Sequence, residues 1–274
     1  MSEEAREGKR WGTFERKMRI AGDLVFETAF HIGSGKEGEL ATDMGVMKEV
    51  DGRPLLPGST LKGCFRSAAE RLAFHLDLRA CLLDASLSGV PCVGDEAYRR
   101  KVLKEFQALP EEKEKLQWLE GHTCHVCRLF GSPFQASRIF FGDGELKEWA
   151  GSYQVRDGVC IDRDSETARP KLKYDFETAP AGARFGFRAE LENPVEEDLA
   201  LTGAVLAEWE SGLRLGGFTS RGLGCARLEN VRTEQVDCTD FEQLRAYLVE
   251  RRMSPVESSV FTDALDRLLS RKGG

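Results

Sequence analysis

Apolar and polar residues alternate near the start of the chain, and the apolar residues take the even positions. The apolar set is Met18, Ile20, Leu24, Phe26, Phe30 and Ile32. A period of two predicts a long strand with one buried face. Gly22 interrupts the pattern and predicts a β-bulge within that strand. The glycine- and acid-rich segment that follows, from Gly33 to Pro57, predicts a loop.

A period of three to four residues begins after this segment. The run Pro57-Gly58-Ser59-Thr60 predicts the start of a helix with Ser59 as its N-cap. The apolar residues of the helix recur along one side, which predicts a buried stripe of Leu61, Phe65, Ala68, Leu72 and Leu76. Lys62 and Arg66 lie four positions apart and therefore share another face near the start of the helix.

The rest of the chain adds strands, a second helix and two insertions. The predicted segments are an insertion of weak periodicity (79–136), a short strand (137–146), an extended hairpin (152–182), a strand (183–191), a helix (196–213), a glycine-rich loop (216–224) and a last strand. Without the insertions the order is β-α-β-β-α-β. This order predicts a single α+β domain, residues 1–274, with a ferredoxin-like or RNA-recognition-type core in which two helices back an antiparallel sheet.

The charge balance changes this picture only locally. The 274 residues carry 39 basic and 46 acidic side chains, a net charge of -7, which as a total argues against a nucleic-acid-binding protein. Residues 53–71 and 212–232 nevertheless each carry a local charge of +3. Both segments contain glycines or a helix start, where backbone amides can meet phosphate. The sequence thus allows polyanion binding along one face of an acidic protein.

The sequence contains neither a long apolar window nor an apolar N-terminal stretch. We therefore expect a soluble, cytoplasmic protein with no membrane partner. Eight cysteines are too few for a disulfide scaffold in a chain of this length. In a reducing compartment they are core residues or metal ligands.

Four of the cysteines have the spacing of a metal site. Cys124 and Cys127 form a C-x2-C pair, the spacing of a zinc knuckle, and Cys81 and Cys92 lie upstream in the same insertion. Four thiolates would hold a structural Zn²⁺, because a closed shell leaves no position for a substrate. Nearby histidines could replace one cysteine, namely His75, His122 and His125. The alternative interpretation is a set of buried thiols without metal.

The glycine-rich loop is a second candidate site. Gly216, Gly217, Gly222 and Gly224 surround Arg221, and glycines allow positive φ and a close approach of backbone amides to phosphate. The loop precedes a strand and does not open a helix, so it is not a dinucleotide-binding fingerprint. If the glycine-rich loop is considered without the rest of the sequence, a tight turn explains its glycines equally well.

Taken in order, these motifs resemble those of a known family. They are HIGSG at the end of the first strand, LPGSTLKG at the helix start, CRLFGS, GVCIDRDSETA and GGFTSRGLG. This order resembles the RAMP superfamily of CRISPR-associated proteins, and within it the backbone subunit of type III effector complexes. The resemblance implies an RNA-recognition-like core and an antiviral ribonucleoprotein. In it, several copies of the protein would line a guide RNA together with other subunits.

The resemblance also implies which residues contact RNA. Ser59, Lys62 and Arg66 would face guide phosphates at the helix N-terminus. Residues 152–182 would form a thumb that inserts between base pairs of the guide–target duplex and displaces a nucleotide. The full set of RNA-binding candidates is His31, Ser59, Lys62, Arg66, Arg163, Gly217, Arg221 and Gly222. For His31, a structural role is the alternative.

Active members of this family cleave target RNA with one aspartate between the first strand and the helix, and here that position is Asp43. The family's reaction is attack of a ribose 2′-OH on the adjacent phosphate with Mg²⁺ or another divalent cation. A carboxylate can position the metal or assist removal of the proton. Other acids share the segment, namely Glu37, Glu39, Glu49 and Asp51.

Three alternatives remain open at this point. The first is a backbone subunit that binds RNA without cleaving it. The second is a RAMP endonuclease that processes precursor guide RNA, for which His31 is the catalytic candidate. The third is a metal-dependent enzyme that uses the cysteine cluster for catalysis, which would need a non-protein ligand on the zinc.

Overall fold

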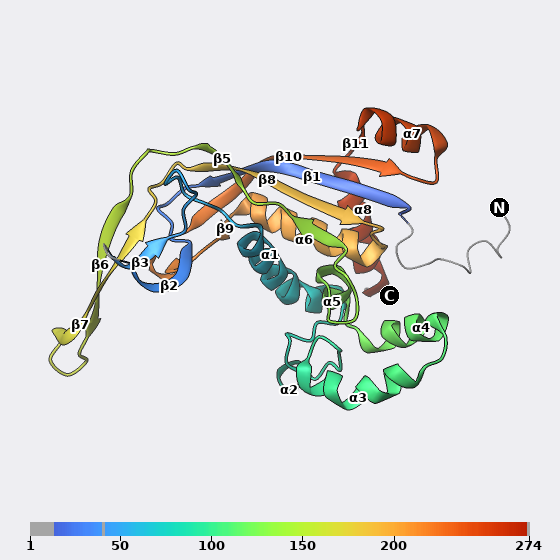
Figure 1. Ribbon diagram of the computed structural model, residues 1–274, viewed down its shortest axis with the longest axis horizontal. Helices are drawn as coiled ribbons and strands as arrows, with labels where there is room; N and C mark the ends of the chain where they lie inside the picture. Colours follow the sequence, from blue (N-terminus) through green and yellow to red (C-terminus); the bar gives the residue numbers. More distant parts are fainter. Residues whose placement is uncertain (1–13, 40–41, 273–274) are drawn as a thin grey trace.

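An antiparallel sheet forms the centre of the molecule in the computed structural model, which describes residues 14–39 and 42–272 (Figure 1). Its strands are β1 (Arg16–Phe26), β4 (Ile139–Phe141), β5 (Glu145–Glu148), β8 (Arg184–Glu192), β9 (Leu213–Arg214), β10 (Cys225–Asp237) and β11 (Ser254–Val256). The strand order is β11-β10-β1-β8-β4, while β5 pairs with β8 and β9 with β10. The prediction of an α+β chain with an antiparallel sheet is confirmed.

The first strand keeps the predicted alternation but ends earlier. Met18 and Phe26 are fully buried, and the register of β1 against β10 shifts between Ala21 and Asp23. A Cβ on Gly22, between them, would lie 2.9 Å from the carbonyl oxygen of Glu229, so this bulge has no room for a side chain. After Phe26 the chain turns, and the apolar residues up to 32 lie beyond the strand.

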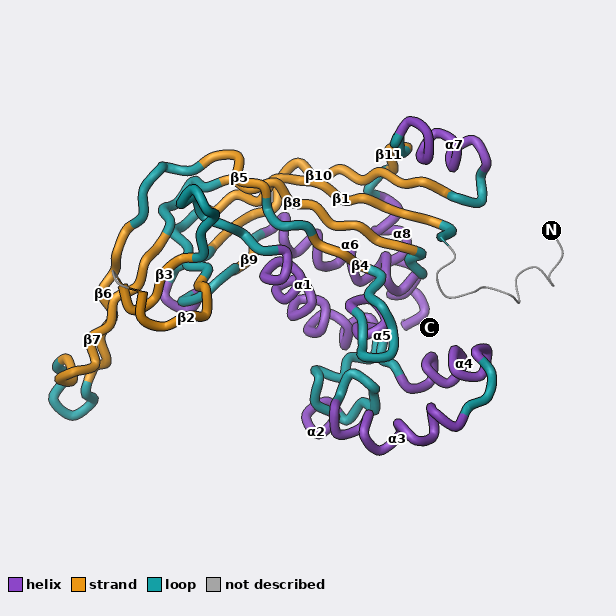
Figure 2. The backbone as a smooth tube through the Cα atoms, viewed as in Figure 1, coloured by secondary structure: helices purple, strands orange, loops and turns teal. Residues whose placement is uncertain are grey.

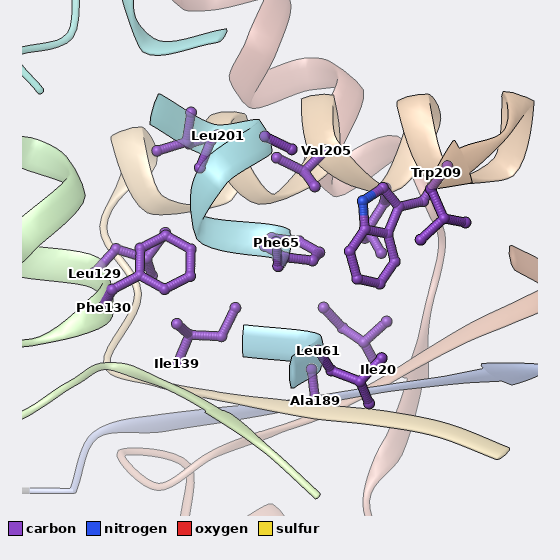
Figure 3. Packing of buried hydrophobic residues seen from close by; sticks show 14 of the residues in the cluster. Ile20, Leu61, Phe65, Leu129, Phe130, Ile139, Ala189, Leu201, Val205 and Trp209 are labelled. Carbon is purple, nitrogen blue, oxygen red and sulfur yellow. The ribbon is translucent and has the colours of Figure 1, made fainter. Parts of the chain in front are cut away.

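Two helices cover one face of the sheet, α1 (Gly58–Ala73) and α6 (Glu196–Ser211). Phe65 of α1 lies at the centre of the interface, with its ring centroid 5.1 Å from Trp209 and 5.3 Å from Phe141 (Figure 3). Truncating such a buried aromatic residue typically costs about 3–5 kcal/mol. A C-terminal helix, α8 (Ser259–Lys272), packs against α6. In the described part of the chain, no helix has the length and apolar character needed to span a bilayer.

The start of α1 differs from the prediction. Pro57 occupies the N-cap position, and Ser59 lies inside the first turn, so the assignment of Ser59 as N-cap was wrong. The backbone N–H of Gly58 donates to Asp143 Oδ1 at 2.6 Å. A carboxylate from the turn between β4 and β5 therefore does the capping, and its charge favours the positive end of the helix.

A smaller sheet projects from the main one. Its strands are β2 (Gly33–Glu39), β3 (Thr42–Val46), β6 (Gln154–Ile161) and β7 (Ala168–Thr178), in the order β2-β3-β7-β6. The prediction of a loop over residues 33–57 was therefore wrong for its first half. The sequence of β3 lacks alternation because the strand depends on pairing with another part of the chain. Met44 of β3 pairs in parallel with Phe176 of β7. The long β6–β7 hairpin extends away from the body of the protein (Figure 2).

Residues 79–136 fold into helices of unequal burial. The helices are α2 (Ala85–Ser88), α3 (Glu96–Ala108), α4 (Glu112–His122) and α5 (His125–Phe130). Helix α3 contains no buried residue and α4 only Leu119, whereas most of α5 is buried. Ring contacts join α3 to its surroundings, with centroid distances of 5.2 Å from Phe106 to Trp118 and 4.7 Å from Phe106 to Phe134. These helices lack a continuous apolar stripe, which explains the weak periodicity of the sequence. A last helix, α7 (Phe241–Glu250), follows β10.

The face of the main sheet opposite α1 and α6 carries a charge network around Glu190. Its carboxylate lies 2.6 Å from Lys17 Nζ, 3.2 Å from Arg19 Nε and 2.6 Å from Arg188 Nη2. Burial by itself would raise the pKa of Glu190, but the hydrogen bonds and charges of these cations outweigh it and lower the pKa to about 2. The network therefore stabilises the folded sheet only while Glu190 is ionised.

We expect Glu190→Gln to lower the free energy of unfolding at neutral pH by about 1–3 kcal/mol. Because the folded-state pKa is depressed, this stability is present above the unfolded pKa of about 4.3 and is lost as the pH falls toward 2. Urea unfolding of both proteins should show a difference that is constant above about pH 5 and shrinks between about pH 5 and about pH 2. A difference independent of pH would contradict this account.

Candidate functional site

A groove of about 920 Å³ lies between α1, the C-terminal end of α6 and the glycine-rich loop (216–224). Thr60, Ser67 and Arg71 form its α1 side, and Arg214 and Gly216 lie among the residues opposite. The groove thus joins the two locally basic segments of the sequence. Sequence analysis had counted Arg71 and Arg214 only as part of the local charge.

The groove carries charges of both signs. The exposed guanidinium groups of Arg71 and Arg214 lie among its lining residues together with Glu27 and Glu208. Burial raises the pKa of the Cys64 thiol, which also lines the groove, to about 11. This thiol is therefore neutral at physiological pH. Arg71 and Arg214 are the cationic side chains among the lining residues. A guanidinium group forms directed hydrogen bonds with one phosphate, so each arginine can bind a phosphate of its own.

His31 and the glycine-rich loop are fixed to each other. Gly216 has φ +94°, and a Cβ there would lie 2.4 Å from the His31 carbonyl oxygen, so only glycine fits. The backbone N–H of Gly217 donates to the same oxygen at 2.7 Å. The buried imidazole of His31 donates from Nδ1 to the carbonyl oxygen of Glu177 at 2.7 Å. His31 therefore links β7 to the loop.

Arg221 and Gly222 lie at the base of the β6–β7 hairpin. Arg221 ends the short 3-10 turn Thr219–Arg221, and its guanidinium donates to the Tyr174 hydroxyl of β7. Gly222 follows with φ +84°. Arg163 belongs to the turn at the far tip of the hairpin, where Asp162 accepts backbone hydrogen bonds. The structure therefore separates Arg163 from the other RNA-binding candidates.

The three candidates on α1 have different surroundings. Ser59 is exposed in the first turn. Lys62 Nζ donates to Ser137 Oγ at 3.1 Å, and burial, with a contribution from the charge of Arg66, lowers the pKa of Lys62. The guanidinium of Arg66 donates hydrogen bonds to Glu70 Oε1 and to Cys127 Sγ. Neither Lys62 nor Arg66 is among the residues that line the groove.

Asp43 lies exposed on β3 and is paired with a second aspartate. Its backbone N–H donates to Asp175 Oδ1 at 2.8 Å, and its Oδ2 accepts the backbone N–H of Asp175 at 3.0 Å. Asp157 faces Asp175 across the hairpin and lies 3.3 Å from Lys173 Nζ. Sequence analysis missed Asp175, because it is one acid among several in a polar strand that lies far from Asp43 in the sequence.

Among the other acids of the segment, Asp51 forms an ion pair within its own turn. Its Oδ2 lies 2.6 Å from Arg53 Nε. The side chains of Glu37 and Glu39 lie outside the described part of the chain. Each hydrogen bond between Asp43 and Asp175 uses one carboxylate oxygen, and carboxylate oxygens are the ligands that Mg²⁺ prefers. Among the described residues, no group of three or more potential metal ligands forms around Asp43, so a divalent cation at this pair of aspartates stays a proposal.

The four predicted cysteine ligands come together in the insertion. The Sγ atoms of Cys81, Cys92, Cys124 and Cys127 all lie within 4.8 Å of one another, and each residue is at most 1% exposed. Backbone N–H groups of Gly94 and Cys124 donate to Cys92 Sγ at 3.3 Å. A Cβ on Gly94 would lie 2.6 Å from Cys127 Sγ, so glycine lets the loop close on the sulfurs. This donor set fits a tetrahedral Zn²⁺.

The histidines considered as replacement ligands lie outside this group of four. His125 Nδ1 accepts the backbone N–H of Arg79 at 2.9 Å, and His122 Nδ1 donates to the carbonyl oxygen of Trp118 at 2.7 Å. His75 belongs to the 3-10 turn Phe74–Leu76 that follows α1. Cysteine therefore supplies all four ligand atoms of the cluster.

Comparison with known proteins identifies the family of the chain. The model of the RAMP superfamily matches residues 23–227, well over half of the chain. The chain belongs to the RAMP superfamily. The match confirms the resemblance drawn from the motifs and includes α1, the cysteine cluster, the hairpin and the glycine-rich loop of this RAMP protein.

Two relatives carry the name CRISPR system Cms endoribonuclease Csm3. The protein from Methanothermobacter thermautotrophicus is 24% identical over 257 residues, which cover 81% of this chain and 87% of the relative. The protein from Methanocaldococcus jannaschii is 24% identical over 239 residues, covering 80% of this chain and 82% of the relative. The similarity to both relatives therefore extends over most of each chain.

We expect the purified protein to contain about one Zn²⁺ per chain. Cys124→Ser should lower both the zinc content and the yield of folded protein, because metal binding and folding are coupled. Elemental analysis and circular dichroism measure the two effects. Cys238→Ser, a change outside the cluster, is the matched control and should keep both. Zinc-free wild-type protein, prepared without chelators and still folded, would contradict the assignment.

Proposed function

We propose that this RAMP protein is a backbone subunit of a type III CRISPR ribonucleoprotein that binds guide RNA and cleaves complementary target RNA. The observation that carries the proposal is the groove between α1 and the glycine-rich loop, because it unites the two motifs of the family that can meet phosphate. The names of the two relatives support ribonuclease activity. Copies of the chain and other type III subunits would complete the particle.

The order of elements supports a ferredoxin-like core for this subunit. Strands β10, β1, β8 and β4 are neighbours in that order, and α1 and α6 cover one face. Taken along the chain, these elements read β-α-β-β-α-β. In this core the N-terminus of α1 and the glycine-rich loop lie at the same end of the sheet, where both line the groove, so one strand of RNA would contact both.

The surface of α1 beside the groove allows RNA to approach the helix closely. Gly63 is exposed, and a Cβ there would meet no heavy atom of the described residues within 4 Å. Glycine inside a helix costs about 1 kcal/mol relative to alanine, and nothing in the packing requires it here. Gly63 lies one turn before Ser67 of the groove. Its missing side chain would therefore make room for the RNA backbone.

The hairpin offers a surface of different chemistry for the bases. Val155, Val159 and Ile161 of β6 are exposed, with exposed fractions of 58%, 48% and 58%. Exposed apolar side chains on a projecting hairpin would stack on bases, whereas phosphates would meet cations such as Arg163. Displacing a nucleotide costs a few kcal/mol, which contacts repeated along the filament would supply.

Cleavage would take place at Asp43, on the strand beside this hairpin. A carboxylate oxygen of Asp43 would accept the proton of the attacking ribose 2′-OH. Asp175 would hold Asp43 in place through two hydrogen bonds, in which the backbone N–H of each residue donates to the carboxylate of the other. A divalent cation, when bound at these carboxylates, would supply charge stabilisation for the phosphate. Zn²⁺ at the cysteines would remain structural.

A subunit that binds RNA without cleaving it is the second candidate. It is favoured by the fact that Asp43 already accepts a hydrogen bond from Asp175, a role that structure alone explains. Guide processing by His31 has less support, because this residue is 6% exposed and bonds to Glu177. Catalysis at the cysteines has less support still, because all four sulfurs are buried and needed as ligands.

We expect Asp43→Ala in the assembled complex to reduce target cleavage by about 10²–10⁴-fold, the range that general acid–base catalysis supplies. The change should cost at most about 1 kcal/mol of stability, since a single exposed hydrogen bond is lost. Asp51→Ala, in the same segment, is the control and should cleave normally. Cleavage by the Asp43 variant at the wild-type rate, in particles of normal size and RNA content, would favour the second candidate.

We expect Gly63→Ala to raise the free energy of unfolding by about 0.5–1 kcal/mol and to weaken guide RNA binding about three- to tenfold. Thermal unfolding and filter binding measure the two effects. Gly121→Ala is the matched control, because Gly121 is also exposed in a helix with open space around it. If both variants bind RNA as tightly as wild type, the RNA does not approach α1 at this turn.

A further inference from the structure

Arg66, which the sequence predicts as a phosphate ligand, points to the cysteine cluster. Its Nη2 lies 3.3 Å from Cys127 Sγ, and its guanidinium carbon lies 6.0 Å from the Phe130 ring centroid. Its Nε donates to Glu70 Oε1 at 2.9 Å. The side chains of Arg66 and Glu70 are only 19% and 18% exposed. The guanidinium is thus held between α1 and the insertion.

The charge of a metal centre explains why a cation lies there. A Zn²⁺ with four thiolates carries a net charge of −2, and burying such an anion is costly unless it is compensated. Backbone N–H groups donate to the sulfurs of Cys92 and Cys124, but they carry no charge. Arg66 brings a full positive charge and a hydrogen bond to Cys127. The hydrogen bond to Glu70 fixes the direction of the guanidinium.

We propose that Arg66 is a positioning residue of the metal centre, which holds the Cys127 thiolate and ties the centre to α1, and that it is not a ligand of guide phosphate. The inference rests on the structural zinc proposed above. It gives the cysteine cluster a role in RNA binding, because the helix that carries Arg66 also forms one wall of the groove. Loss of the metal would loosen that wall.

The test compares Arg66→Gln and Arg66→Lys with Arg71→Gln, a control on the groove side of the same helix. Zinc affinity is measured on the full chain without RNA, by competition with a chromogenic chelator. We expect Arg66→Gln to bind zinc about 10–100-fold more weakly, because this is the usual effect of removing a side chain that contacts a metal ligand. Arg66→Lys should recover part of this affinity. Arg71→Gln should bind zinc as tightly as the wild-type protein. Co²⁺ substitution should show a shifted sulfur-to-metal charge-transfer band in Arg66→Gln alone.

RNA binding by the zinc-loaded variants separates this inference from the proposed groove. Arg71→Gln should reduce the slope of log K against log salt by about one, whereas Arg66→Gln should leave it unchanged. Unchanged zinc affinity and an unchanged Co²⁺ spectrum in both Arg66 variants would overturn the inference, even if the groove binds RNA. A reduced salt slope in Arg66→Gln would overturn it as well, because Arg66 would then contact phosphate. Arg66→Lys keeps the test decisive if Arg66→Gln does not fold.

Discussion

The burial of Phe65 fixes the helix on which the rest of the site depends. Its ring lies between Trp209 of α6, Phe141 of β4 and Phe130 of α5, with centroid distances of 5.1, 5.3 and 6.3 Å. One side chain therefore joins the sheet, the second helix and the insertion to α1. This packing fixes the orientation of α1 about its axis, and with it the direction of the two sides of the helix that do not carry Phe65. One side faces the groove, and the other faces the cysteine cluster.

These two sides separate the roles that the sequence places on one helix. Thr60 and Ser67 are small and line the groove, while Arg66 is held by hydrogen bonds to Cys127 and Glu70. An arginine bonded inside the protein would lose its partners on turning to RNA, and this cost disfavours phosphate binding by Arg66. Arg71 and Arg214, exposed in the groove, face no such cost. The chemistry of the helix thus follows from how it is packed.

The sequence predicts the elements best where local patterns and burial agree. The alternation in β1 and β8 and the stripe of α1 specify those elements, because each buries one face against the core. The strands β2 and β3 have no such pattern and depend on pairing with the hairpin, which no local rule shows. The cap of α1 was missed for the same reason, since Asp143 is distant in the sequence.

The candidate site shows the same division. Spacing within the insertion indicated the four cysteines correctly as a group, because ligands of one metal must converge. Spacing could not indicate which way Arg66 points, or that Asp175 lies beside Asp43, since both depend on tertiary contacts. Residues of α1 that share a face in the helix were expected to share a ligand. The structure instead gives Lys62 and Arg66 different partners within the protein.

The central claim is that α1 meets RNA on the side that faces the glycine-rich loop, while its Arg66 side holds the metal centre. A cryo-electron microscopy structure of the assembled particle with guide RNA tests it most directly. The account predicts guide phosphates within hydrogen-bond distance of the groove side of α1 and of Arg214, with Arg66 still bonded to Cys127. A guide that runs over the opposite face of the main sheet, or an Arg66 turned toward a phosphate, would contradict it.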